Sequence, residues 1–347
     1  MQKEHINGKG TNVITSGVSN YGILGKTDVK ARILPSGSIT VDMFGNVFYR
    51  NFEYKMVTHA RVFSLCPKVE LTDNQRIFIA SALRFLRYHF GMDNMCTWDK
   101  IKKKKINLPI TSKGEVDYAF MESYIAEMNA TRLMELSEYL SLKGLNNSML
   151  NESEQTAIES LSGKRWEQYT LGDLFDKKET KKLSYKAKDL PSEAKGEYLL
   201  PCLTSSFNNQ GLNYYVPYNG ATILKNVITL PSNSDVYRAY YQSSDFTVLS
   251  DAYAIDWIYD QRKLTREQYL FMVMCINKVT DRSIYSHKNK LGGWNVVKGK
   301  KIMLPVLNGQ IDFDFMHDLI SSIEKLIVKD VVSYTKKKIF KTDDTTN

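Results

Sequence analysis

The chain contains one succession of residues twice. The matching pairs are Ile39-Thr40 with Ile228-Thr229, Leu71-Thr72 with Leu264-Thr265, Trp98 with Trp294, and Leu108-Pro109 with Leu304-Pro305. The offset between partners grows from 189 to 196 residues along the chain, whereas chance matches would scatter. Because a regular internal repeat indicates repeated structural units, the duplication predicts two modules of one fold. A chain of 347 residues is long enough to give each its own core.

Each copy begins with short alternating runs that are typical of strands and are broken by Gly, Asn and Ser turns. The expected strands are Asn12–Thr15, Ser38–Val41, Tyr198–Leu200 and Val227–Leu230. A helix with a Thr N-cap and an acidic first turn should follow, over Asn74–Phe90 and over Gln268–Val279. A lysine-rich segment around a Trp then leads to a strand that ends at Leu-Pro.

Each copy closes with an apolar stripe at helical spacing, which predicts a long helix that begins several residues after the Leu-Pro pair. One interpretation is that each helix packs on its own β-rich module. We favour the other, in which the two helices pack together like a coiled coil. About 28 helical residues would extend roughly 42 Å and could hold two modules apart. The residues expected in the helix pair are Met121, Ile125, Met128, Leu136, Met316, Leu319, Ile323 and Leu326.

The net charge of +9 slightly favours a polyanionic partner over a merely basic protein. The four cysteines lie far apart, so each is expected to be a buried apolar residue and no metal site is predicted. The first residues lack the apolar core of a secretory signal, and no run approaches the roughly 20 apolar residues of a membrane span. We therefore expect a cytoplasmic protein without a membrane partner.

Several segments resemble the target-recognition domains of specificity subunits from type I restriction-modification systems and the related type IIB systems. They are Trp166–Phe175 (WEQYTLGDLF), the turn at Ile14–Gly22 with a weaker copy at Cys202–Gly211, the Lys-to-Leu-Pro strand, and the Asp-aromatic start of the next helix. The order of these elements, present twice, makes the resemblance specific. Only the second copy has the opening segment Trp166–Phe175, so the N-terminal segment of the first module is expected to be missing. Either the chain is truncated, or other residues complete the first module.

The resemblance implies an α/β fold with two similar target-recognition domains, each a β-rich module with helices, linked by two long antiparallel helices. The expected divisions are 1–112 (first domain), 113–162 (spacer helix and linker), 163–307 (second domain) and 308–347 (C-terminal helix and tail). It also implies a non-catalytic subunit that binds double-stranded DNA at a two-part asymmetric site. Methyltransferase subunits, and where present a nuclease subunit, would dock on it and bring S-adenosylmethionine, ATP and Mg²⁺.

The sequence offers little for catalysis by the chain itself. It has no Asn-Pro-Pro-Tyr or Asp-Pro-Pro-Tyr methyltransferase motif, no Walker A motif and no G-x-G-x-x-G cradle. The histidines lie in different segments without a nucleophile at a suggestive spacing. Two alternatives stay open: a stand-alone nuclease with degenerate motifs, and a truncated scaffold that has lost DNA specificity.

Candidates for base contact are Asn, Arg, Lys and Tyr side chains expected at loop tips in the β-rich parts. They are Asn20, Tyr21, Asn46, Tyr49, Arg50 and Lys55 in the first module and Asn208, Asn209, Asn233, Tyr237 and Arg238 in the second. The alternative for each Asn is ordinary turn formation. Arg50 and Arg238 each follow an aromatic residue and are expected to be equivalent in the repeat.

Lysines before each Leu-Pro pair are candidates for phosphate contact, with a solvated surface as the alternative. These candidates are Lys102, Lys103, Lys104, Lys288 and Lys290, accompanied by His287.

Overall fold

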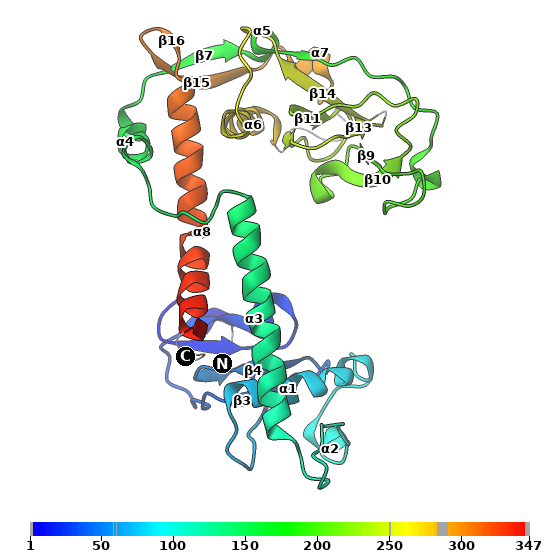
Figure 1. Cartoon of the computed structure of the whole chain (residues 1–347), viewed down its shortest axis with the longest axis vertical. Helices are drawn as coiled ribbons and strands as arrows, with labels where there is room; N and C mark the ends of the chain where they lie inside the picture. Colours follow the sequence, from blue (N-terminus) through cyan, green and yellow to red (C-terminus); the bar gives the residue numbers. More distant parts are fainter. Residues whose placement is uncertain (1–2, 58, 60, 250, 283–290, 344–347) are drawn as a thin grey trace. The chain divides into compact units, whose positions relative to one another are not determined.

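The computed structural model describes the chain except residues 1–2, 58, 60, 250, 283–290 and 344–347. It divides into two compact units (Figure 1). The first unit comprises residues 1–139 and 335–347, and the second comprises residues 140–334. Among the described residues, no helix has the length and apolar character needed to cross a membrane.

The first unit has two three-stranded sheets, in the orders β2-β1-β5 and β4-β3-β6. The strands are β1 (Thr11–Ile14), β2 (Ile23–Thr27), β3 (Ser38–Val41), β4 (Val47–Arg50), β5 (Tyr54–Met56) and β6 (Phe63–Leu65). The helices are α1 (Asp73–Ala82), α2 (Trp98–Ile101) and α3 (Tyr118–Leu142), with 3-10 turns η1 (Lys3–His5), η2 (Ser19–Gly22) and η4 (Arg84–Tyr88). Helix α1 contacts β3 and β4 and covers that sheet.

The second unit has three sheets, in the orders β10-β9-β13, β12-β11-β14-β8 and β16-β15-β7. The strands are β7 (Trp166–Thr170), β8 (Phe175–Lys177), β9 (Leu200–Leu203), β10 (Leu212–Val216), β11 (Val227–Pro231), β12 (Tyr240–Gln242), β13 (Thr247–Val248), β14 (Ala252–Trp257), β15 (Lys301–Leu307) and β16 (Gln310–Ile311). The helices are α4 (Glu152–Ser160), α5 (Leu171–Leu174), α6 (Arg266–Thr280), α7 (Trp294–Val297) and α8 (Phe313–Asp343), with 3-10 turns η5 (Leu161–Gly163), η6 (Ala187–Asp189) and η7 (Asn208–Gly211).

The two units repeat one topology, which confirms the predicted mixed α/β fold with two similar modules. Sheet β2-β1-β5 corresponds to β10-β9-β13, and in both the outer strand β5 or β13 runs parallel to the central one. Sheet β4-β3-β6 corresponds to β12-β11-β14, all antiparallel. Helices α1 and α6 both begin with a capping box, on Thr72 and Thr265, as the two threonines predict.

The predicted Leu-Pro strand forms in the second unit only. There β15 pairs antiparallel with β7, the first strand of the opening segment, so that Leu304 faces Glu167 and Pro305 faces Trp166. The matching residues 102–109 form no strand in the described part of the first unit, and just after them an isolated bridge joins Ile110 to Val116. A strand needs a hydrogen-bonded neighbour, and among the described residues of the first unit none pairs with this segment as β7 pairs with β15.

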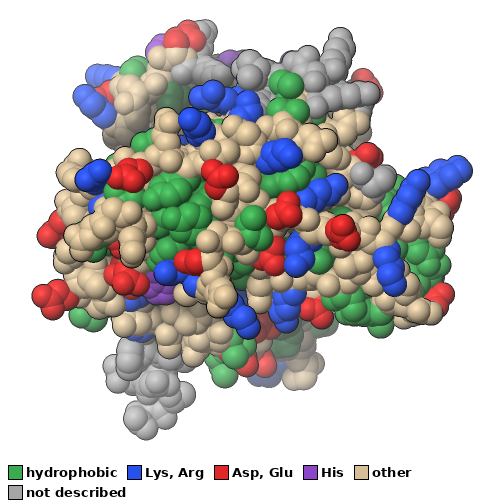
Figure 2. Space-filling view, turned by 90° about the horizontal axis from the view of Figure 1, so that it is seen from above, with side chains coloured by type: hydrophobic (Ala, Val, Ile, Leu, Met, Phe, Trp, Pro, Cys, Tyr) green, Lys and Arg blue, Asp and Glu red, His purple; other side chains and the backbone are tan. Residues whose placement is uncertain are grey.

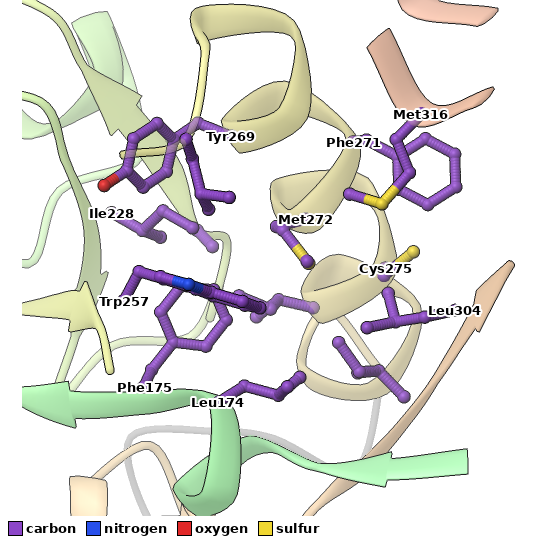
Figure 3. Close-up of a cluster of buried hydrophobic side chains, with 14 of the residues drawn as sticks. Leu174, Phe175, Ile228, Trp257, Tyr269, Phe271, Met272, Cys275, Leu304 and Met316 are labelled. Atoms are coloured by element: carbon purple, nitrogen blue, oxygen red, sulfur yellow. The ribbon is translucent and has the colours of Figure 1, made fainter. Parts of the chain in front are cut away.

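The main core of the second unit surrounds α6 (Figure 3). Phe271, Met272 and Cys275 project from α6 and are buried among side chains from the opening segment and the sheets, such as Phe175 and Trp257. This helix confirms the prediction. Its counterpart is shorter than predicted, because α1 ends at Ala82 and the chain tightens into η4.

The long helices α3 and α8 form where the apolar stripes predict. Met316 (Figure 3) and Leu319 on α8 belong to the core of the second unit, as in the interpretation that each helix packs on its own module. Ile323 and Leu326 are exposed. On α3, Met121 and Ile125 are buried, Leu136 is half-buried and Met128 is exposed. The pairing of the two helices and the division of the chain into four segments stay predictions.

The cysteines follow their prediction in three cases of four. Cys96, Cys202 and Cys275 are buried and free, whereas Cys66 is exposed because it follows directly after β6, where the chain leaves the sheet.

Candidate nucleic-acid interface

Each unit carries the same unusual turn between the first two strands of its first sheet. In η2 the backbone is left-handed at Asn20 (φ 46°) and Tyr21 (φ 53°). In η7 it is left-handed at Asn209 (φ 47°) and Gln210 (φ 55°). Two consecutive left-handed residues other than glycine are costly and persist only where the surroundings impose them. The repeat therefore keeps a strained turn in both units while the second residue differs.

The asparagine in each turn has a structural role. Asn20 Nδ2 donates to the Ile23 carbonyl at 3.2 Å, and Asn209 Nδ2 donates to the Leu212 carbonyl at the same distance. These side chains close the turn on the backbone three residues ahead. The structure thus favours turn formation over base contact for Asn20 and Asn209. Asn208, just before, has an exposed side chain.

Tyr21 projects from its turn with 70% of its surface exposed, and its ring meets the Phe48 ring edge-to-face with centroids 6.1 Å apart. Two adjoining hollows, of about 320 and 200 Å³, lie between this turn, β4 and η4. Tyr21, Phe48 and Arg84 line both, and Arg87 lines the smaller one. We call this region the first cleft. Arg84 and Arg87 are exposed, and within the described residues neither makes a hydrogen bond or ion pair.

Three predicted base contacts of the first unit are buried. Asn46 donates from Nδ2 to Asp42 Oδ2 (2.9 Å) and belongs to the β3–β4 loop. Lys55 is 4% exposed, and its Nζ donates to the carbonyls of Thr27 and Val29. Arg50 is also buried, and burial lowers the pKa of its guanidinium to about 10, so the group stays charged at neutral pH. The structure corrects the prediction of base contact for these residues, since each is held in the interior.

Tyr49 is half-buried, and its hydroxyl donates to Asp73 Oδ1 at 2.6 Å. Burial, and next the hydrogen bond to Asp73, raises the pKa of this phenol. The side chain thereby links β4 to the start of α1 and also lines the larger hollow of the first cleft.

Strand register corrects the predicted equivalence of Arg50 and Arg238. Arg50 faces Ser38 across β3–β4, and Gln242 faces Val227 at the same place across β11–β12. Arg50 Nε donates to Thr40 Oγ1 at 2.9 Å, and Gln242 Nε2 donates to Thr229 Oγ1 at 3.1 Å. The β3–β4 connection is shorter than the β11–β12 connection, so sequence order alone aligned the wrong residues.

The second unit has a polar hollow of about 530 Å³ between its turn and the β11–β12 loop. We call this region, together with Gln210 and Gln242, the second cleft. Its lining includes Ser206, Asn213, Asn233, Asp235 and Asp251. Asn233 Oδ1 is buried and has no hydrogen-bond partner among the described residues.

The other two candidates of the second unit make contacts within the protein. Tyr237 is buried beside Gly292, where a Cβ would lie 1.7 Å from its ring, so the structure corrects its assignment to base contact. Arg238 is about half exposed but forms an ion pair with Asp281 at 2.8 Å. Asn277, at the repeat position of Arg84, holds the backbone of Ala239 through both amide atoms.

The predicted phosphate contacts are only partly described. Lys102, Lys103 and Lys104 are exposed after α2, and Lys102 pairs with Asp99 at 2.6 Å. His287, Lys288 and Lys290 lie outside the described residues. Figure 2 shows basic and acidic side chains interspersed on the face it presents, so charge alone marks no binding surface there.

Sequence reasoning missed Arg84, Arg87, Gln210 and Gln242. The spacing of Arg84 and Arg87 was a usable signal, because residues three apart on a helical turn share a face. Within the described ranges, no three His, Cys, Asp or Glu side chains are grouped as a metal site would require.

Comparison with known proteins identifies the family. The family described as "Type I restriction modification DNA specificity domain" matches residues 1–138 and 163–332, one match for each copy of the repeat. The chain belongs to this family.

Relatives agree with that assignment. The chain is 24% identical over 338 residues to the "Type II restriction enzyme BgcI specificity subunit S.BcgI" of Heyndrickxia coagulans, covering 94% of this chain and 89% of the relative. Among solved structures, the S subunit of a type I restriction-modification system from M. genitalium aligns with a TM-score of 0.52 and 16% identity, over 98% of this chain and 88% of that one. The latter likeness supports the specificity-subunit fold in both units.

Proposed function

We propose that this specificity subunit binds a two-part, asymmetric site on double-stranded DNA, one part through each unit. The observation that carries the proposal is the left-handed turn that both units repeat beside a cleft, with Tyr21 at its tip in one and Gln210 in the other. Because the two turns have the same backbone conformation, they present their tip side chains in the same way. Different tip side chains favour different base edges. Two similar domains with different tips therefore suit two different half-sites.

In this proposal the chain recognises DNA, and partner subunits perform the chemistry. Methyltransferase subunits, with S-adenosylmethionine, dock on the long helices α3 and α8, which also fix the unread spacer. A nuclease subunit, where present, brings ATP and Mg²⁺. The absence of methyltransferase and Walker motifs from the sequence supports this division of labour.

Footprinting of the reconstituted complex tests the proposal. We expect two protected patches separated by an unprotected gap on DNA that carries the site. Protection without sequence preference would support the alternative of a scaffold that has lost specificity. Cleavage of DNA by the purified chain with Mg²⁺, without any partner, would support the nuclease alternative and overturn the proposal.

A further inference from the structure

The first and second clefts differ in the charge they offer. In the first cleft, Arg84 and Arg87 lie on one turn, η4, beside Tyr21, and their guanidinium groups are unpaired within the described residues. At the corresponding place in the second unit, the repeat position of Arg84 is Asn277, and the nearby Arg238 forms an ion pair with Asp281. Only the first cleft therefore presents free guanidinium groups next to its turn, among the parts of both clefts that the structure describes.

The backbone around the first cleft is built to hold these arginines close to the loop. Gly45 has a φ of 77°, and a Cβ there would lie 2.6 Å from the Leu86 carbonyl, so the β3–β4 loop approaches η4 more closely than a side chain would allow. Asp42 braces the same loop by accepting from Gly17 N at 2.7 Å and from Asn46 N at 2.9 Å. The loop, the η2 turn and η4 are thus fixed against one another, which keeps the cleft preorganised.

The aromatic side of the cleft is also fixed. Phe48 lies between the exposed Tyr21 ring, which it meets edge-to-face, and the Arg50 guanidinium, 5.0 Å from its ring centroid. Tyr21 therefore offers a flat apolar surface beside two hydrogen-bond donors. A planar ligand edge with two adjacent acceptors fits this arrangement, because a guanidinium donates two parallel hydrogen bonds.

We propose that Tyr21, Arg84 and Arg87 recognise a guanine in one half of the DNA site, whereas the second cleft, with Gln210 at the matching position, recognises a different base. Guanine displays O6 and N7 as adjacent acceptors in the major groove, and arginine is their commonest partner. The inference rests on the proposed function, because it assigns a base to a cleft that contacts DNA only if the proposed function holds. Arg84 or Arg87 supplies the paired donors, and Tyr21 excludes water from one side of the base pair.

Selection of bound sequences from a randomised DNA library by the full reconstituted complex tests the inference. The variants are Arg84→Gln, Arg87→Gln and Tyr21→Ala, with Arg32→Gln as a matched control. Arg32 is exposed in the same unit and outside the cleft, so its replacement removes the same charge. We expect wild type to require a guanine in one half-site. At least one arginine variant should lose that preference by about tenfold or more and leave the other half-site unchanged.

The salt dependence of affinity separates base contact from phosphate contact. Losing a phosphate contact weakens binding to all sequences and makes the negative slope of log K against log salt shallower by about 0.9. We expect Arg84→Gln or Arg87→Gln to keep the slope of Arg32→Gln while changing base preference. The inference would be overturned if both arginine variants showed a shallower salt slope and an unchanged base preference. A wild-type site without the guanine would also overturn it. A wild-type complex with no two-part site would instead refute the proposed function.

Discussion

Gln242 occupies the place of Arg50 in the repeat, and both side chains donate to the same threonine of the neighbouring strand, Thr229 and Thr40. A half-buried amide in one unit thus makes the hydrogen bond that a buried guanidinium makes in the other. This pair defines the register that relates the two units.

The pairing predicts that Arg50→Gln is tolerated better than Arg50→Ala. The amide can restore the hydrogen bond to Thr40, whereas Ala leaves that hydroxyl short of a partner and opens a void, a difference of about 1–2 kcal/mol. Thermal unfolding of both variants, compared with wild type, measures the order. Equal midpoints for the two variants would show that the bond to Thr40 contributes nothing.

Lys55→Met should destabilise the first unit without altering which DNA is bound. The change leaves the Thr27 and Val29 carbonyls without the Lys55 donor, at a cost of about 1–3 kcal/mol for a buried group such as Thr27. Denaturant unfolding gives the loss, and library selection gives the specificity. Lys9→Met, at an exposed position of the same unit, is the control and should change neither. An altered base preference in Lys55→Met would support the original prediction that Lys55 contacts a base.

Glu154 makes the second unit sensitive to acid. Burial opposes ionisation of its carboxyl, but hydrogen bonds from Lys325, Ser321 and the Asn151 backbone together hold its pKa below the ordinary value of 4.5. Because the folded pKa is the lower one, this stabilisation is complete above pH 4.5 and is lost as pH falls through the folded value.

Glu154→Gln should therefore lower stability at neutral pH and flatten the dependence of stability on pH below about 4.5. Unfolding midpoints across the acid range measure both effects, and Glu159→Gln, an exposed position on the same helix, is the control. Parallel curves for wild type and Glu154→Gln would contradict the assignment.

Gly292→Ala should destabilise the second unit through Tyr237. The added Cβ would lie 1.7 Å from the Tyr237 ring, so one of the two must move, at about 1–3 kcal/mol for overpacking. Tyr237→Ala removes the clash, so the double variant should lose less stability than the sum of the single changes. Additive losses in the unfolding midpoint would show that the two residues do not meet.

Thiol labelling of the native protein should modify one cysteine rapidly. Cys66 is exposed, whereas burial raises the pKa of the Cys96 thiol to about 11 and that of the Cys202 and Cys275 thiols to about 12. Reaction with a chromogenic disulfide at neutral pH counts the accessible thiols, because the thiolate is the reacting form. Rapid loss of more than one thiol, or a Cys66→Ser variant that still reacts, would contradict the burial pattern.

Features that depend on neighbouring residues in the chain could be predicted from the sequence. The capping threonines, the position of α6 and the duplication itself follow from local pattern and spacing. Polar residues that the fold buries were harder to place, because Lys55 is polar by composition and buried only through the fold. Register across loops of unequal length was also hidden, which is why Arg238 was matched to Arg50.

In the turns at Asn20-Tyr21 and Asn209-Gln210, the asparagine holds the backbone, and we propose that the residue after it contacts the ligand. Asparagine closes the loop in both copies, so its neighbour is free to change without disturbing the strands on either side. In the function that we propose, a change of the tip residue alone alters the base preference of one half-site, so that an engineered subunit could be reprogrammed one half at a time.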